Sequence, residues 1–235
     1  MATMKFKALR QAVYEANMEL PRRGLVMYSW GNVSAIDRAA QVIAIKPSGV
    51  PYETLSPDKI VVLDPDGQVV DGDLRPSSDT PTHLELYRAF GGIGAVCHTH
   101  ARHTVMWAQA NRPISCFGTT HADFFYGPVP VTESMRPEEI ETDYELNTGR
   151  VIVRRFVEDR LDPAQMPAVL VAGHGPFTWG PTAAKAVEAM VVLEEVARMA
   201  LGTIQIEPNA KGIHESLLNK HYFRKHGEGA YYGQA

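Results

Sequence analysis

The sequence predicts one α/β domain that spans residues 1–235. A domain of this length buries about 70% of the surface of its unfolded chain, so a sizeable core is available. Apolar residues make up 45% of the chain and charged residues 21%, as in ordinary globular proteins. Strand-like runs with turn signals alternate with helical periodicity, and no internal repeat, linker or change of composition divides the chain.

The first part of the chain is predicted to form a helix followed by antiparallel strands. Apolar residues recur at spacings of three and four from Phe6 onward, which predicts an amphipathic helix that ends near Glu19, before Pro21. The runs NVSAID and QVIAIKPSG, separated by RAA, are typical of a hairpin. The run KIVVLDPDGQVV repeats this pattern around the turn signal Asp66-Gly67.

Helices and strands alternate in the middle of the chain. The stretch SSDTPTHLELYRAFGG predicts a helix, with polar residues before Pro81 in the first turn and Gly91-Gly92 at the end. IGAVCHTH is expected to form a strand and ARHTVMWAQA a helix. ISCF and VPVT predict two short strands, and PEEIETDYELNTGRVIVRRFVED predicts one or two helices.

The last third of the chain is predicted to be mainly helical. MPAVLVAGHGPFTWG contains a buried strand that ends in a turn, and a long helix follows from Pro181 to Gly202. The stretch HESLLNKHYFRKHG predicts a final helix before the aromatic tail GAYYGQA.

Composition excludes several classes of function. The formal net charge of −4 argues against nucleic-acid binding, and the sequence contains neither G-x-G-x-x-G nor a P-loop. The two cysteines, Cys97 and Cys116, do not imply a disulfide framework. No run of about 18 apolar residues predicts a membrane span, and the amino terminus lacks the apolar stretch of a signal peptide. We therefore expect a cytoplasmic protein without a membrane partner.

The stretch VCHTHARHTVMWAQ contains three histidines within six residues. In a strand, side chains two residues apart face the same side, so His98 and His100 are expected to project together. Such a pair is a weak signal by itself, because catalytic zinc needs about three protein ligands. His103 has a different spacing and is expected to support the ligands or to lie on the surface.

Two residues elsewhere are candidate partners for this pair. His174 follows an apolar strand and lies between two glycines, a favoured place for a functional side chain, although a histidine there is by itself more often an ordinary loop residue than a ligand. Asp79 precedes the helix that starts at Thr80-Pro81, so it is either a metal-site carboxylate or a helix N-cap.

Further polar groups occur in short loops rich in small residues. His121 and Asp123 lie in GTTHADFFYG, where aromatic surroundings could raise a carboxyl pKa for proton transfer, or where the aspartate simply stabilises a turn. Three loops offer N–H and hydroxyl donors suited to phosphate, although each alone is only a turn: Gly31-Asn32, Ser48-Gly49 and Ser77-Ser78.

Taken together and in order, seven stretches resemble the class II aldolase/adducin family: WGNVSAID, IKPSGV, PSSDTPTHLELY, HTHARHTVMWAQ, GTTHADFFYG, VLVAGHGPFTWG and KHYFRKHGEGAYYGQ. The resemblance spans nearly the whole chain, and the joint occurrence of the motifs is far more specific than any one of them. It implies a three-layer α/β/α fold around a central, mainly antiparallel sheet. It also implies a homotetramer with four-fold symmetry and active sites between adjacent subunits.

The resemblance also implies roles for individual residues. His98, His100 and His174 would bind a divalent metal, usually zinc, otherwise Mn²⁺ or Co²⁺, and Asp79 matches the acidic residue of the metal site. The three small-residue loops match the substrate and phosphate sites, with Lys46 as an additional charge: Gly31, Asn32, Ser48, Gly49, Ser77 and Ser78.

The proton-transfer pair of the family matches Asp123 and Tyr232, and the resemblance implies that Tyr232 comes from the tail of the neighbouring subunit. His221 and Arg224, on the last predicted helix, either contact the neighbouring site or only make the surface soluble. The sequence does not decide between these two roles.

The resemblance is to the family members that interconvert L-ribulose 5-phosphate and D-xylulose 5-phosphate by retro-aldol cleavage and re-addition at the C3–C4 bond. Aldolases of the family that cleave L-fuculose 1-phosphate are the alternative, but they carry a glutamate at the position of Asp79. A non-enzymatic domain like the adducin head is the other alternative. Arabinose and ascorbate catabolism use very similar enzymes, so the motifs leave the supplying pathway open.

Overall fold

A computed structural model describes residues 5–227 and 229–232 of the chain. Seven strands form one sheet in the order β4-β3-β2-β1-β5-β7-β6, and every neighbouring pair is antiparallel. The strands are β1 (Asn32–Asp37), β2 (Val42–Ile45), β3 (Val61–Leu63), β4 (Val69–Asp71), β5 (Ala95–His98), β6 (Ala168–Val171) and β7 (Gly175–Gly180). The predicted α/β class with a central antiparallel sheet is confirmed.

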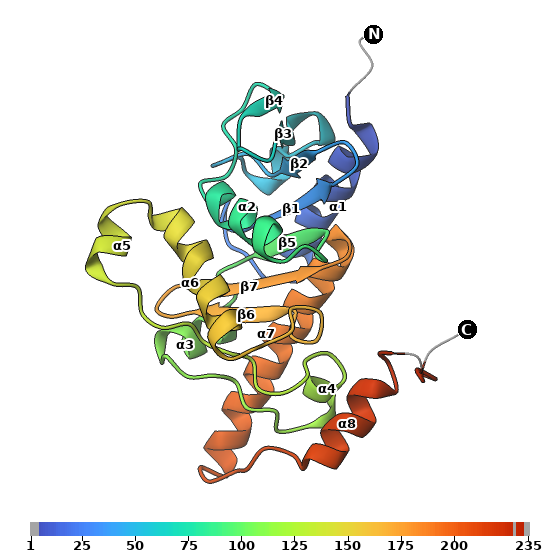
Figure 1. Cartoon of the computed structure of the whole chain (residues 1–235), viewed down its shortest axis with the longest axis vertical. Coiled ribbons are helices and arrows are strands. Elements are labelled where there is room, and N and C mark those ends of the chain that lie inside the picture. The colour runs from blue at the N-terminus through green and yellow to red at the C-terminus, as the bar shows by residue number, and fades with distance from the viewer. Residues whose placement is uncertain (1–4, 228, 233–235) are drawn as a thin grey trace.

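Helices cover both faces of the sheet (Figure 1). One face packs against α1 (Lys7–Arg22) and α7 (Ala183–Ile206), and the other against α2 (Thr80–Ala89) and α6 (Tyr144–Glu158). Adjacent residues of β7 show this division, because Thr178 donates a hydrogen bond to Ala186 of α7 while Trp179 packs against Phe90 and Phe156 on the opposite face. Alternation of side chains along each strand therefore creates two buried layers.

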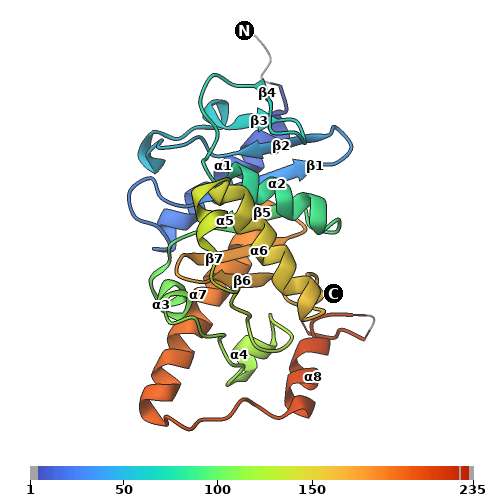
Figure 2. The same ribbon diagram turned by 60° about the vertical axis from the view of Figure 1, so that its left-hand side comes forward.

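The remaining helices surround this three-layer core: η1 (Tyr52–Thr54), η2 (Pro57–Lys59), α3 (Arg102–Gln109), α4 (Thr119–Ala122), α5 (Pro137–Glu141) and α8 (Glu215–Phe223). Helix α3 packs against α7 and the β6–β7 pair. Helices α4 and α8 contact each other and lie at the end of the molecule opposite to β3 and β4 in both views (Figures 1 and 2). No helix in the described part of the chain has the length and apolar character needed to cross a bilayer.

Several predicted boundaries are wrong. Helix α1 continues through Pro21 to Arg22, because the residue before a proline is disfavoured in a helix but not excluded from it. Helix α7 continues past Gly202 to Ile206, since its packing against the sheet outweighs the weak helix propensity of one glycine.

The predicted strands ISCF and VPVT are also wrong. They form only isolated bridges, between Ile114 and Val129 and between Val131 and Leu170. Strand β5 stops at His98, so His100 lies beyond it, in the connection to α3.

Candidate metal centre and active site

A cavity of about 410 Å³ opens where β1 begins, β5 ends and α2 begins. Its lining combines the predicted metal residues with all three small-residue loops. The residues are Ser29, Trp30, Gly31, Asn32, Lys46, Pro47, Ser48, Gly49, Ser77, Ser78, Asp79, His98, His100, Tyr144, Glu145 and His174. Segments that are distant in sequence therefore meet at one polar hollow, a typical arrangement for a binding site.

Three histidines converge on this cavity. One ring nitrogen from each of His98, His100 and His174 lies within 4.8 Å of the others. Ring centroids are 4.8 Å apart for His98 and His174, 5.0 Å for His98 and His100, and 5.1 Å for His100 and His174. The strand register places His98 opposite Asn32 on one side and Phe177 on the other. The rings meet although His100 is not on the strand, because the chain turns toward α3 directly after β5.

Burial disfavours the charged form of His100 and His174, and a hydrogen bond orients His98. Burial lowers the pKa of His174 to about 3, with further lowering from His98 and His100, and burial also lowers the pKa of His100. The Nδ1–H of His98 donates to the carbonyl of Pro176 at 2.9 Å, which directs its Nε2 lone pair elsewhere. Three imidazoles are a donor set suited to zinc and to other divalent transition metals.

Asp79 lies beside this cluster. It occupies the N-cap position of α2, but its side chain caps no helical N–H and instead accepts a 2.6 Å hydrogen bond from Asn32 Nδ2. Burial alone would raise the pKa of Asp79, but the imidazoles of His98 and His83 and the Asn32 hydrogen bond lower it. The alternative role as a helix cap is thus not supported by the side-chain contacts, and a carboxylate faces the histidines.

The three predicted small-residue loops are held together by hydrogen bonds. Ser77 N donates to Lys46 O at 3.1 Å, and Ser48 N donates to Arg75 O at 2.9 Å. Gly31 has a positive φ of 76°, and a Cβ there would lie 3.0 Å from the carbonyl oxygen of His98, so this close approach requires glycine. The loops therefore meet at the same cavity as the histidines.

Lys46 and Asn32 carry polar atoms that a ligand could use. Lys46 is 2% exposed and donates to Ser29 O at 3.1 Å, and burial lowers its pKa to about 8. Asn32 Oδ1 is buried without a hydrogen-bond partner among the described residues. An unpaired buried acceptor at a cavity wall is expected to be satisfied by a bound donor.

Sequence reasoning did not assign Tyr144, Glu145 and Trp30, which also line this cavity. The Tyr144 hydroxyl lies 3.4 Å from His174 Nδ1, and Glu145 follows it in the first turn of α6. Trp30 lies with its ring centroid 6.1 Å from that of His100. A polar first turn after the Asp143 N-cap was the only signal for Tyr144 and Glu145, and it resembles any exposed helix start.

Asp123 is placed away from the cavity, at the end of α4. Its carboxylate accepts hydrogen bonds from Arg224 at 2.8 Å and His221 at 3.0 Å and pairs with Lys225 at 3.2 Å. Burial tends to raise the pKa of Asp123, but these donors lower it. His221 and Arg224 are therefore hydrogen-bond partners of Asp123 and do more than make the surface soluble.

Tyr232 belongs to the same cluster. Its ring lies 4.7 Å from the Arg224 guanidinium carbon and 4.6 Å from Lys225 Nζ, and 59% of the residue is exposed. The predicted proton-transfer pair thus lies together at α4 and α8, and neither member lines the cavity of the same chain. His121 instead donates from Nε2 to the carbonyl of Gly127 at 2.8 Å, a structural role.

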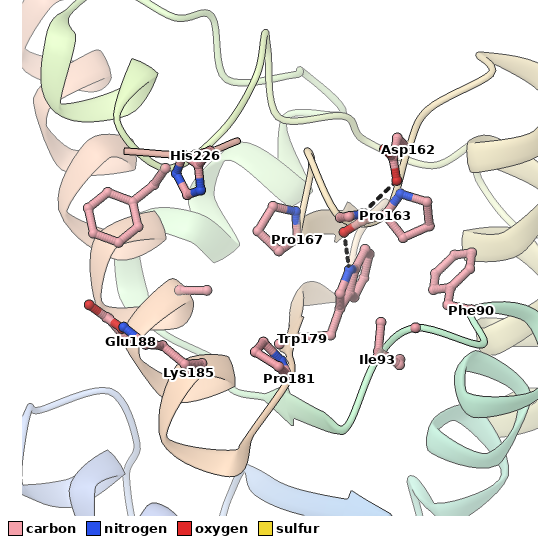
Figure 3. A pocket seen from close by; sticks show the side chains of 15 residues that line it. Phe90, Ile93, Asp162, Pro163, Pro167, Trp179, Pro181, Lys185, Glu188 and His226 are labelled. Atoms are coloured by element: carbon pink, nitrogen blue, oxygen red, sulfur yellow. Dashed lines mark hydrogen bonds and ion pairs between the residues drawn. The ribbon is translucent and has the colours of Figure 1, made fainter. Parts of the chain in front are cut away.

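A second cavity, of about 640 Å³, lies beside the amino-terminal end of α7 (Figure 3). Its walls are mainly apolar, with Trp179, Pro181 and Pro167 around it, and the Trp179 indole N–H is already bonded to Pro163 O at 2.8 Å. Lys185 and Glu188 at its edge pair with each other. In the described part of the chain, the group of histidines that could hold a metal lies at the smaller polar cavity and not here, so the smaller cavity is the better candidate active site.

The family model described as the Class II Aldolase and Adducin N-terminal domain matches residues 11–201. The chain belongs to the class II aldolase and adducin family. The family resemblance in the sequence motifs is therefore confirmed.

The names of similar proteins and structures agree with this family assignment. Proteins named L-ribulose-5-phosphate 4-epimerase UlaF from Salmonella paratyphi A and from Salmonella typhi are each 53% identical to this chain, over 96% of it and 98% of their own length. A solved structure named L-fuculose 1-phosphate aldolase superimposes with a TM-score of 0.79 at 23% identity, covering 94% of this chain and 97% of that one. At this lower identity the likeness shows the shared class II aldolase fold alone.

Single substitutions of the three histidines test the metal centre. We expect His98→Asn, His100→Asn and His174→Asn each to reduce bound divalent metal at least tenfold, because three protein donors are needed for tight binding at such a site. Metal content after purification and dialysis, measured by elemental analysis, checks this. His214→Asn is the matched control, because His214 is exposed and lies at the start of α8, outside the cavity. Equal metal in all four variants would contradict the assignment.

Proposed function

We propose that this member of the class II aldolase and adducin family is a divalent-metal-dependent carbohydrate isomerase, an L-ribulose-5-phosphate 4-epimerase. The observation that carries the proposal is the convergence of His98, His100 and His174 with the phosphate-type loops on one cavity. The 53% identity to proteins of that name over nearly the full length supports the same reaction.

The residues present fit a bound divalent metal. Three imidazoles converge, burial disfavours the charged form of His174, and the carboxylate of Asp79 lies beside them. We propose His98, His100 and His174 as the ligands of zinc, or of Mn²⁺ or Co²⁺, with Asp79 as the acidic group of the site. When bound, the metal supplies positive charge that stabilises the oxygens left negative as the C3–C4 bond breaks.

The remaining groups of the cavity suit the phosphate end of the substrate. We propose that Ser48, Gly49, Ser77 and Ser78 donate to the phosphate while buried Lys46 supplies charge. Asn32 and Gly31 would contact the sugar, since Asn32 Oδ1 is an unpaired acceptor. These contacts retain the two-carbon aldehyde that cleavage releases, so that it can turn over before the bond re-forms.

Inversion at C4 requires a proton acceptor on one face and a donor on the other. Breaking the C3–C4 bond takes the proton from the C4 hydroxyl, and re-addition to the opposite face returns one to the new C4 oxygen. We propose Asp123 and Tyr232 as this pair. The donors around Asp123 lower its pKa and keep its carboxylate ionised, as a proton acceptor needs.

The distance in the fold between the cavity and the Asp123 cluster supports a site shared between subunits. The cavity contains no residue of the Asp123 cluster, so we propose that a neighbouring copy supplies Asp123 and Tyr232, in a four-fold homotetramer. Large apolar side chains beside the cavity support a covered surface, since Met27 is 56% exposed, Tyr28 84% and Trp30 48%. We place the enzyme in the cytoplasm, where its two buried free cysteines stay reduced.

The proposed reaction is tested with L-ribulose 5-phosphate as substrate. We expect conversion to D-xylulose 5-phosphate that stops with a chelator and returns with added zinc, followed by a coupled assay for xylulose 5-phosphate. Accumulation of dihydroxyacetone and glycolaldehyde phosphate would favour an aldolase instead. A protein that binds no divalent metal and turns over no sugar would favour an interaction domain like the adducin head.

Mixed oligomers test the shared site. Asp123→Asn and His98→Asn alone should each lower turnover about 100-fold or more. Co-refolded subunits of the two variants should regain about a quarter of the wild-type rate, because that fraction of sites pairs an intact cavity with an intact Asp123. Tyr232→Phe can replace Asp123→Asn in the same mixture as an independent test. Inactive mixtures of correctly assembled oligomers would place both halves of the site in one subunit.

Lys46 gives a pH-dependent prediction. Its buried ammonium has a pKa of about 8, so the charge is present below that pH and lost above it. We expect kcat/KM, which reports the free enzyme, to fall as pH rises through about 8. Lys46→Met should lower kcat/KM and remove this decline. A decline of the same size in Lys46→Met would show that another group titrates.

A further inference from the structure

The carboxylate of Glu194 in α7 accepts four hydrogen bonds from the start of α3. Oε1 accepts from His103 N at 2.9 Å and His103 Nδ1 at 2.7 Å. Oε2 accepts from Thr104 N at 3.0 Å and Thr104 Oγ1 at 3.1 Å. One side chain from a distant helix therefore binds two consecutive backbone N–H groups and both of their side chains.

These N–H groups are the ones that a helix leaves unpaired in its first turn. Helix α3 begins after Ala101, whose side chain carries no oxygen to cap them. Ser, Thr, Asp or Asn normally does this locally at the N-cap. Here the carboxylate of Glu194, on α7, accepts these hydrogen bonds instead. Its negative charge also complements the positive end of the helix dipole.

The two ends of α3 contact the segments that carry two of the three proposed metal ligands. His100 lies in the short connection between the end of β5 and α3. At the other end of the helix, Ala108 O accepts a 2.9 Å hydrogen bond from Gly173 N, next to His174. Gly175, on the far side of His174, packs so closely that a Cβ there would lie 3.0 Å from Thr99 O.

The three rings differ in how they are fixed. His98 lies on the central strand and donates to Pro176 O, and His174 lies near the Tyr144 hydroxyl. For His100, the described part of the chain offers no side-chain hydrogen bond, so its position depends on the backbone that joins β5 to α3. That backbone is anchored on one side by the sheet and on the other by Glu194.

We propose that Glu194 is a positioning residue of the metal centre. By capping α3 it fixes the backbone of His100, and through Ala108 it steadies the turn of His174, so it sets the metal affinity without touching the metal. The inference rests on the metal centre proposed above, but it adds a residue that belongs to neither the ligand set nor the substrate loops. His103 then serves the site through its contact with Glu194.

Zinc titration of the chelator-stripped, full-length protein tests this inference. The variants are Glu194→Gln, which keeps the shape and one acceptor oxygen, and Glu194→Ala, which removes both. Glu195→Gln is the matched control, since Glu195 is the next residue of α7 and pairs only with exposed Arg198 at 2.8 Å. Competition with a chromophoric chelator gives the zinc Kd, and circular dichroism and Tm report folding.

We expect a zinc Kd at least about tenfold weaker in Glu194→Gln and weaker still in Glu194→Ala, with Glu195→Gln equal to the parent, as for other residues that orient metal ligands. In Glu194→Gln, saturating zinc should restore kcat while KM for the sugar phosphate stays unchanged. A parental zinc Kd in folded Glu194→Gln, even with a lower Tm, would reduce Glu194 to a structural cap and overturn the inference.

The titration separates this inference from the proposed reaction. A parent protein that binds zinc but does not epimerise L-ribulose 5-phosphate would refute the reaction, and a weaker Kd in Glu194→Gln would still support the positioning role. A parent protein that binds no divalent metal would overturn the metal centre and this inference together.

Discussion

The site depends on the antiparallel pairing of β5 with β1 on one side and β7 on the other. This register places His98 directly between Asn32 and Phe177. From this position Asn32 donates a hydrogen bond to Asp79, and His174 directly precedes the first residue of β7. A one-residue slip in either pairing would turn His98 to the opposite face, toward α7. The core packing that fixes the register therefore also fixes the arrangement of the proposed metal ligands.

Burial then sets the protonation states of the groups that this register collects. It lowers the pKa values of His100 and His174, which leaves lone pairs available to a metal. It also lowers the pKa of Lys46 to about 8, so an incoming phosphate meets an ammonium poorly solvated by water. Both effects have the same origin, since a low-dielectric wall disfavours charge until an opposite charge arrives. Both effects suit the dianionic substrate and the divalent metal that we propose for this cavity.

The two halves of the proposed chemistry lie in different parts of the chain. Arg224, His221 and Lys225 contact the carboxylate of Asp123 and lower its pKa. This cluster, at α4 and α8, contributes no residue to the cavity that holds the three histidines. In the proposed assembly, a neighbouring copy would bring Asp123 to that cavity.

The local sequence pattern was sufficient to predict much of the fold. Turn signals and alternation predicted the antiparallel strands before α2, and the long helical period predicted α7. The isolated bridges at Ile114 and Val131 show the limit, because short apolar runs fit a strand or a packed loop equally well. Pro21 and Gly202 show it as well, since sheet packing outweighs a weak local breaker.

The sequence by itself determined the family, through seven motifs in order, and with it the residue types of the site. Tertiary structure alone decided which of them meet. In the folded chain, Asp79 accepts a hydrogen bond from Asn32 instead of capping its helix, and the Tyr144 hydroxyl lies near His174. Glu194 of α7 caps the start of α3. Such contacts join residues up to about ninety positions apart. No local periodicity records them, because they arise only when the helices close over the sheet.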